Sequence, residues 1–125
     1  MTRWHMHNSR ERGLSGSVQV VVLLPALFSV LLLLLQWSLY SWASATAHAA
    51  AQEAALTIAS LDGTAEAAVA SGSQVSANGA LTLVQVRVVR GAQSSSATVS
   101  GRSVSVLWDA DIVVTVTVPT ERITR

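Results

Sequence analysis

The chain of 125 residues contains no cysteine, no lysine and only two prolines, and charged residues make up 12% of it. Without cysteine it has no disulfide framework, no thiolate nucleophile and no cysteine-ligated zinc site. Eight arginines and seven acidic residues leave a net charge of +1, which gives no general attraction to nucleic acid. Aromatic residues amount to 5%, which argues against a large aromatic-lined pocket for a small-molecule substrate. We expect one small domain.

A long apolar run dominates the N-terminal third. Residues 18–35 read VQVVVLLPALFSVLLLLL, and no charged residue occurs between Arg12 and Glu53. A helix of this length covers the roughly 30 Å hydrocarbon layer of a membrane. Pro25 lies inside the run, where membrane helices tolerate proline, so we expect a bend and no break. The pattern predicts a transmembrane helix over residues 18–42.

Residues on both sides of the run indicate its orientation. Trp37, Tyr40 and Trp42 follow it, where aromatic rings favour the membrane interface, and we take them as interface anchors. Three arginines precede the run and none follows it before Arg87. The positive-inside rule then makes residues 1–17 a basic cytoplasmic tail and places the rest of the chain outside the cytoplasmic membrane.

A cleaved signal peptide is the alternative to a membrane anchor. Small-x-small cleavage patterns occur at Ala43-Ser44-Ala45 and at Ala47-His48-Ala49. The apolar run is longer than the usual core of a signal peptide, and three aromatic residues separate it from these patterns. The anchor is therefore favoured, with the secreted form kept as the rival.

An alanine-rich helix is expected to continue outside the membrane over residues 43–62. It contains no proline or glycine before Gly63, which is the expected stop. Small or apolar residues recur at intervals of three and four, a stripe that permits close packing against another helix. The stripe consists of Ala43, Ala47, Ala50, Ala54, Ile58 and Leu61. Residues 63–80, with Gly72 and Gly79, are expected to form a linker.

Residues 81–125 are predicted to form a small antiparallel β module. The segments expected as strands are residues 81–89, 97–99, 103–108 and 112–118, separated by Arg90-Gly91, by Ser94–Ser96 and by Asp109–Asp111. Alternation of polar and apolar residues implies a sheet of three or four strands with one buried face, which the outer half of the long helix can cover. The predicted fold class is an α+β membrane protein.

The residues that carry reaction chemistry form no recognisable constellation. His48 stands alone on the alanine-rich helix, His5 and His7 lie in the N-terminal tail, and Asp109 and Asp111 fit a turn better than a calcium loop. No nucleophile and base can be paired, and the glycines form no phosphate-binding pattern. We assign no catalytic residue, no metal and no cofactor, and we do not expect an enzyme. Arg87, Arg90 and Arg102 are interpreted as a solvated strand face.

The residues around the start of the apolar run resemble a known family. Arg12-Gly13, the small residues to Ser17, Val18-Gln19 and Leu24-Pro25 are similar to the start of TadE-like proteins, the pilin-like minor components of tight-adherence (Flp type IVb) pilus machinery in bacteria. The resemblance extends in outline to the alanine-rich helix and the Val/Thr-rich sheet. It implies a pilin-like, membrane-anchored assembly component whose partners are other pilus or secretion-machinery subunits.

The same segment departs from that family at one position. Pilin-like proteins are commonly cut after a glycine, with glutamate at the fifth mature position. Here Gly13 and Gly16 are the available glycines, and the neutral Gln19 stands in the glutamate register. Gln19 supplies no charge to a neighbouring subunit's terminal amine. This processing region therefore favours an unprocessed accessory protein over a major filament subunit. A secreted or membrane-tethered β domain unrelated to pili remains the alternative.

Overall fold

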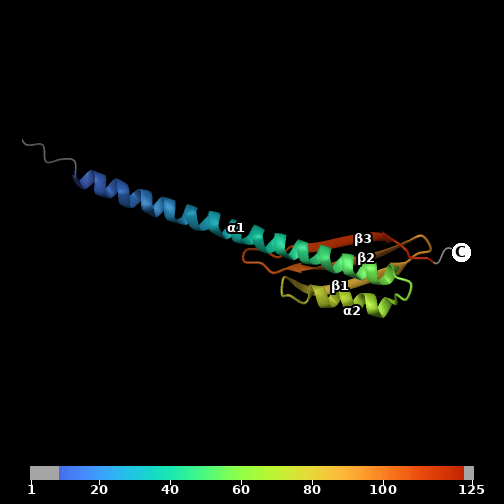
Figure 1. The fold of residues 1–125 in the computed structure, drawn as a ribbon. Helices are drawn as coiled ribbons and strands as arrows, with labels where there is room; N and C mark the ends of the chain where they lie inside the picture. Colours follow the sequence, from blue (N-terminus) through green and yellow to red (C-terminus); the bar gives the residue numbers. More distant parts are fainter. Residues whose placement is uncertain (1–8, 123–125) are drawn as a thin grey trace, which may run out of the picture. The chain divides into compact units, whose positions relative to one another are not determined.

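The computed structural model describes residues 9–122, and the surroundings of side chains from residue 16 onward. Its element order is α1 (Ser9–Ala59), α2 (Ala65–Ser76), β1 (Leu81–Arg90), β2 (Ser94–Ser103) and β3 (Asp111–Pro119) (Figure 1). The chain divides after Leu34 into two compact units. The predicted α+β class, a long apolar helix followed by a small antiparallel sheet, is confirmed.

The first unit contains the apolar part of α1. Every residue from 16 to 35 is exposed, and this part of the helix is apolar and long enough to be a candidate membrane span. The helix continues through Pro25, as expected. Ser29 donates its hydroxyl to the Pro25 carbonyl at 2.7 Å, which satisfies a polar side chain inside the helix, as a lipid environment demands.

The second unit is a three-stranded antiparallel sheet with two helical segments packed against it (Figure 1). The strand order is β1-β2-β3. Val99 in the central strand pairs with Val86 on one side and with Val114 on the other. On the same face of the sheet, alanines of α1 join Val99 and Val114 in the buried core. The outer half of the long helix therefore covers the apolar face of the sheet, as the alternation in the strands predicted.

The alanines of α1 are the helix side of this core. Ala43, Ala47, Ala50 and Ala54 are fully buried and Ile58 nearly so. The buried face is wider than the predicted stripe, because it also includes Ala51, Ala55 and Ala59. Leu61 lies in the turn beyond α1 and is exposed, so its place in the stripe was wrong. The small side chains bring the helix close to its own sheet, which leaves these alanines no surface for a helix of another subunit.

The segment expected as a linker, residues 63–80, contains helix α2. Thr64 begins this helix, since its hydroxyl accepts a hydrogen bond from the Ala67 amide. Gly72 does not interrupt it, because it is buried where a side chain would crowd its neighbours. A Cβ there would lie 3.1 Å from the Ala54 Cβ and 3.2 Å from the Val86 Cγ1. The glycine is a point of close approach between α2, α1 and β1.

Two strand boundaries also differ from the prediction. Ser94–Ser96, expected as a loop, are the first residues of β2; Ser95 and Ser96 pair with both neighbouring strands, and Ser94 pairs with β3. Residues 104–108, expected as a strand, belong instead to the connection between β2 and β3. The alternating pattern there was misleading because no neighbouring strand is present to pair with it.

Strand β1 carries a bulge at Leu83. The register with β2 shifts between Thr82 and Gln85, and Leu83 adopts a positive φ of 53°. This left-handed conformation is unfavourable for a residue with a side chain. It turns Leu83 outward, where its side chain is 75% exposed.

Candidate interaction surfaces

The candidate span presents an apolar surface with one polar residue near its start. Gly16 and Gln19 are exposed on α1, and no atom from elsewhere in the fold lies within 4 Å of the Cβ position of Gly16. Gly13 is helical, but it lies before the residues whose surroundings are described. The predicted processing region is thus part of a continuous helix.

The three predicted interface anchors lie in the second unit, directly after the apolar run. Trp37, Tyr40 and Trp42 are 69%, 41% and 46% exposed. Their rings can therefore contact the surrounding lipid or water. A role at the membrane interface is consistent with this exposure and remains a prediction.

Gln36 is buried on α1, immediately before Trp37, and holds the connection between β2 and β3. Its side chain is only 4% exposed. The amide oxygen accepts hydrogen bonds from the backbone N–H groups of Val106 (3.0 Å) and Leu107 (3.1 Å). The amide nitrogen donates to the backbone carbonyl of Trp108 at 2.8 Å. One side chain thereby fixes three consecutive residues of the connection to the helix.

The connection 104–110, named here the apolar loop, carries exposed apolar side chains. The exposed fractions are 36% for Val104, 49% for Val106, 43% for Leu107 and 56% for Trp108. At its two ends, the Ser103 amide donates to the Ala110 carbonyl and the Val104 amide to the Ala80 carbonyl. The loop is therefore tied down by its backbone while its apolar side chains face outward.

The arginines of the sheet do not share one face. Arg90 reaches the end of α1, where its Nη1 donates to the backbone carbonyls of Ile58 (2.9 Å), Ser60 (2.8 Å) and Gly63 (3.2 Å). These carbonyls belong to the end of a helix, where intrahelical partners run out and a positive charge is favourable. Arg102 forms an exposed ion pair with Asp111 at 3.2 Å. Arg90 is thus exposed, as the solvated-face interpretation expects, but its guanidinium is bound to backbone carbonyls and is not surrounded by water alone.

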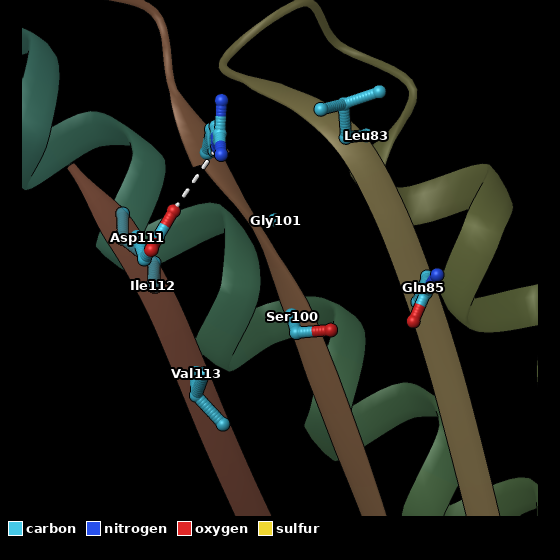
Figure 2. Close-up of a pocket in the computed structure, with 8 residues that line it drawn as sticks. Leu83, Gln85, Ser100, Gly101, Asp111, Ile112 and Val113 are labelled. Atoms are coloured by element: carbon cyan, nitrogen blue, oxygen red, sulfur yellow. Dashed lines mark hydrogen bonds and ion pairs between the residues drawn. The ribbon is translucent and has the colours of Figure 1, made fainter. Parts of the chain in front are cut away.

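The outward face of the sheet is polar and holds an open depression of about 240 Å³. Figure 2 shows Leu83, Gln85, Ser100 and Val113 around it, together with the Arg102–Asp111 ion pair. Val113 is 67% exposed. Beside the depression, the hydroxyls of Thr98 and Thr115 lie 2.9 Å apart across β2 and β3. The lining offers hydrogen-bonding groups and three apolar side chains, Leu83, Ile112 and Val113, but no nucleophile paired with a base.

The other polar residues considered from the sequence have local structural partners. His48 contacts the Ser44 carbonyl one turn earlier on α1 through its Nδ1 at 3.0 Å. Asp109 accepts a hydrogen bond from the Ser105 hydroxyl at 2.5 Å. Within the described part of the chain, no group of three or more histidine and acidic side chains could hold a metal ion. His5 and His7 lie outside the described residues.

A comparison with protein families matches part of α1 to a known family. The family model of TadE-like proteins matches residues 15–56, which all lie in α1, and confirms the resemblance seen at the start of the apolar run. The matched stretch covers the apolar part of α1 and most of the part that packs on the sheet, but none of α2 or the strands. Neither the curated proteins nor the solved structures gave a match to this chain.

Sequence reasoning missed the two side chains that tie α1 to the sheet, Gln36 and Arg90. A signal for Gln36 exists, because it is a lone amide between Leu35 and Trp37 on the same helix face as Ala43 and Ala50. No comparable signal marks Arg90. Its role depends on a long-range approach of β1 to the end of α1, which the local pattern does not contain.

Proposed function

We propose that the chain is a membrane-anchored, pilin-like accessory protein in the assembly of a tight-adherence (Flp type IVb) pilus or a related secretion machinery. Residues 18–42 span the bacterial cytoplasmic membrane once, with residues 1–17 in the cytoplasm and the sheet outside. The protein acts through protein–protein contacts and performs no catalysis. The observation that carries the proposal is the family match over residues 15–56, which includes the exposed apolar helix and the part of α1 that packs on the sheet.

The packing of α1 supports an anchor over a cleaved signal peptide. Cleavage after Ala45 or after Ala49 would remove Gln36 and Ala43, which are buried in the second unit. A chain that begins at Ala50 would also lack Ala47, another member of the core. Removal of buried residues from so small a module would leave the apolar face of the sheet partly uncovered.

The contacts with other subunits are assigned to two exposed surfaces. Because the alanine stripe is covered by the chain's own sheet, helix packing with other subunits falls to the exposed apolar part of α1, residues 16–35. In this part of the helix, Val and Leu side chains, and not the alanine stripe, would pack against helices of other subunits within the membrane. The polar outward face of the sheet, around Thr98 and Thr115, is the extracytoplasmic contact surface.

The intact mass of a C-terminally tagged copy from the native host tests the anchor and the processing together. A full-length mass in the membrane fraction supports the unprocessed accessory protein. A mass that begins after Gly13 or Gly16 means that a prepilin peptidase accepts Gln19. A released species that begins at Thr46 or Ala50 would replace the proposal with a secreted protein unrelated to pili.

Topology and partners need a second experiment, for which the absence of cysteine is convenient. Ser96→Cys should react with a membrane-impermeant maleimide on spheroplasts, whereas Ser9→Cys should react only after lysis. A photo-crosslinking residue at Leu31 or Thr98 should then capture subunits of the pilus machinery, and the same residue at Gln52 serves as the control. Capture of no such subunit from either position would favour the unrelated membrane-tethered β domain.

A further inference from the structure

The apolar loop is hydrogen-bonded to the residue that directly follows the apolar run. Gln36 binds the backbone of Val106, Leu107 and Trp108, and Gln36 directly follows Leu35, the last residue of the run. The hydrogen bonds therefore hold this loop to the first residue after the apolar run. Because Gln36 is bonded to Leu35 in the chain, the loop lies beside the end of the apolar run wherever the rest of that run lies.

Several backbone groups at the ends and in the middle of the loop have hydrogen-bond partners within the protein. The amides of Ser103 and Val104 donate to backbone carbonyls, and those of Val106 and Leu107 donate to Gln36. Polypeptide near hydrocarbon must satisfy its polar groups within the protein, and these four amides meet that demand. Gln36 is buried in making these bonds.

The side chains of the loop have the composition of a membrane interface. Trp108 is 56% exposed with Leu107 and Val106 beside it, and tryptophan favours the headgroup boundary. Trp37, Tyr40 and Trp42, which follow Gln36 on α1, are also exposed. The loop contains one acidic residue, Asp109, and no basic residue. Its attraction is therefore to the apolar boundary of a lipid layer and not to anionic headgroups.

We propose that the apolar loop inserts Val106, Leu107 and Trp108 into the outer interfacial layer of the membrane, as a second anchor beside the single span. The inference rests on the proposed membrane insertion of residues 18–42. Two attachments, one covalently continuous with the span and one through the loop, fix the sheet against the membrane surface. A single helix would leave the second unit free to rotate and tilt.

Tryptophan quenching in lipid tests the loop and the span separately. The full chain is reconstituted in phosphatidylcholine vesicles that carry a doxyl label at a shallow or a deep acyl position. One variant keeps only Trp108 (Trp4→Phe, Trp37→Phe, Trp42→Phe), and a second keeps only Trp37 (Trp4→Phe, Trp42→Phe, Trp108→Phe). We expect both to lose emission to the shallow label more than to the deep label, and Trp108 to be shielded from aqueous acrylamide. Added anionic lipid should not increase the quenching of Trp108.

Each other outcome overturns a distinct statement. Quenching of Trp37 by lipid, with Trp108 open to acrylamide, would overturn the loop anchor and leave the span intact. Absence of lipid quenching at both positions would overturn membrane insertion and with it the proposed function. Shielding of Trp108 from both lipid and acrylamide would mean that a second copy of the chain covers the loop.

Two variants of the Trp108-only chain locate the cause. Val106→Ser with Leu107→Ser removes the apolar side chains but keeps the backbone groups that bind Gln36, and should reduce lipid quenching of Trp108. Gln36→Ala should reduce it by releasing the loop, whereas Gln52→Ala, at an exposed position of the same helix, should leave it unchanged. Unchanged quenching in the serine double variant would contradict the proposal even if Gln36→Ala fails to fold.

Discussion

Gln36 and Trp108 are joined by a hydrogen bond of 2.8 Å, although 72 positions separate them in the chain. The bond runs from the side-chain amide of a helical residue to a backbone carbonyl in the connection between two strands. Residues 106–108 have no neighbouring strand to pair with, and the Gln36 side chain provides their backbone hydrogen bonds instead. The same glutamine also accepts two backbone N–H groups, so it is the main structural partner of the apolar loop.

Gln36→Ala should lower the stability of the second unit by about 2 kcal/mol, because three part-buried backbone groups of the loop would lose the partner that the buried Gln36 amide gives them. Thermal unfolding of the full chain in detergent micelles, followed by circular dichroism, measures the change. Gln52→Ala is the matched control on the exposed side of α1, and its melting temperature should stay at that of the unmodified protein. Equal melting of both variants would mean that water replaces Gln36 at no cost.

Arg90→Leu should destabilise the protein by about 1 kcal/mol, because the carbonyls at the end of α1 lose a charged donor. Arg90→Lys should recover part of this loss, since it keeps the charge but not the geometry of the guanidinium. Arg87→Leu, at an exposed position of the same strand, is the comparison variant. If Arg87→Leu destabilises the protein as much as Arg90→Leu does, the loss of stability comes from the change in net charge and not from the contact with the end of α1.

At an exposed helix position, replacing glycine by alanine stabilises a helix by roughly 1 kcal/mol. Gly72→Ala should not stabilise the protein in this way. The added methyl group would meet the Ala54 Cβ at 3.1 Å and the Ala50 carbonyl at 3.3 Å, and overpacking offsets the gain in propensity. Ser73→Ala, at the neighbouring exposed position, should stabilise α2 slightly. A clear rise in melting temperature for Gly72→Ala would show that the two helices separate easily.

Ala50→Leu should destabilise the second unit by about 1–3 kcal/mol, because the fully buried methyl group faces the sheet and leaves no room for a larger side chain. Ala49→Leu, at the adjacent exposed position, should change the melting temperature little. Both variants should still fractionate with the membrane, because the apolar run is unchanged. Loss of pilus partners from Ala49→Leu alone would indicate that the exposed side of this helix makes the contact instead.

Local patterns in the sequence determined the long helix and the class of the fold. A helix over residues 18–35 was predicted because an apolar run of this length has no other regular structure in lipid, and the alanine-rich continuation follows from helix propensity. The buried face of the sheet was readable from alternation in residues 112–118, where Ile112 and Val114 are buried and Val113 is exposed. The start of the apolar run was sufficient for the family resemblance, since the matching residues are contiguous.

Tertiary structure alone decided what the alanine stripe, the glycines and the apolar loop do. A small-residue stripe predicts close packing but does not name the partner, which here is the chain's own sheet. From the sequence, Gly72 was expected in a linker. In the structure it lies in α2 at a close contact with α1 and β1. Residues 104–108 alternate as a strand does, yet pairing depends on a neighbouring strand, and Gln36 takes its place. Long-range contacts of this kind are set by chain topology and are absent from any local window of the sequence.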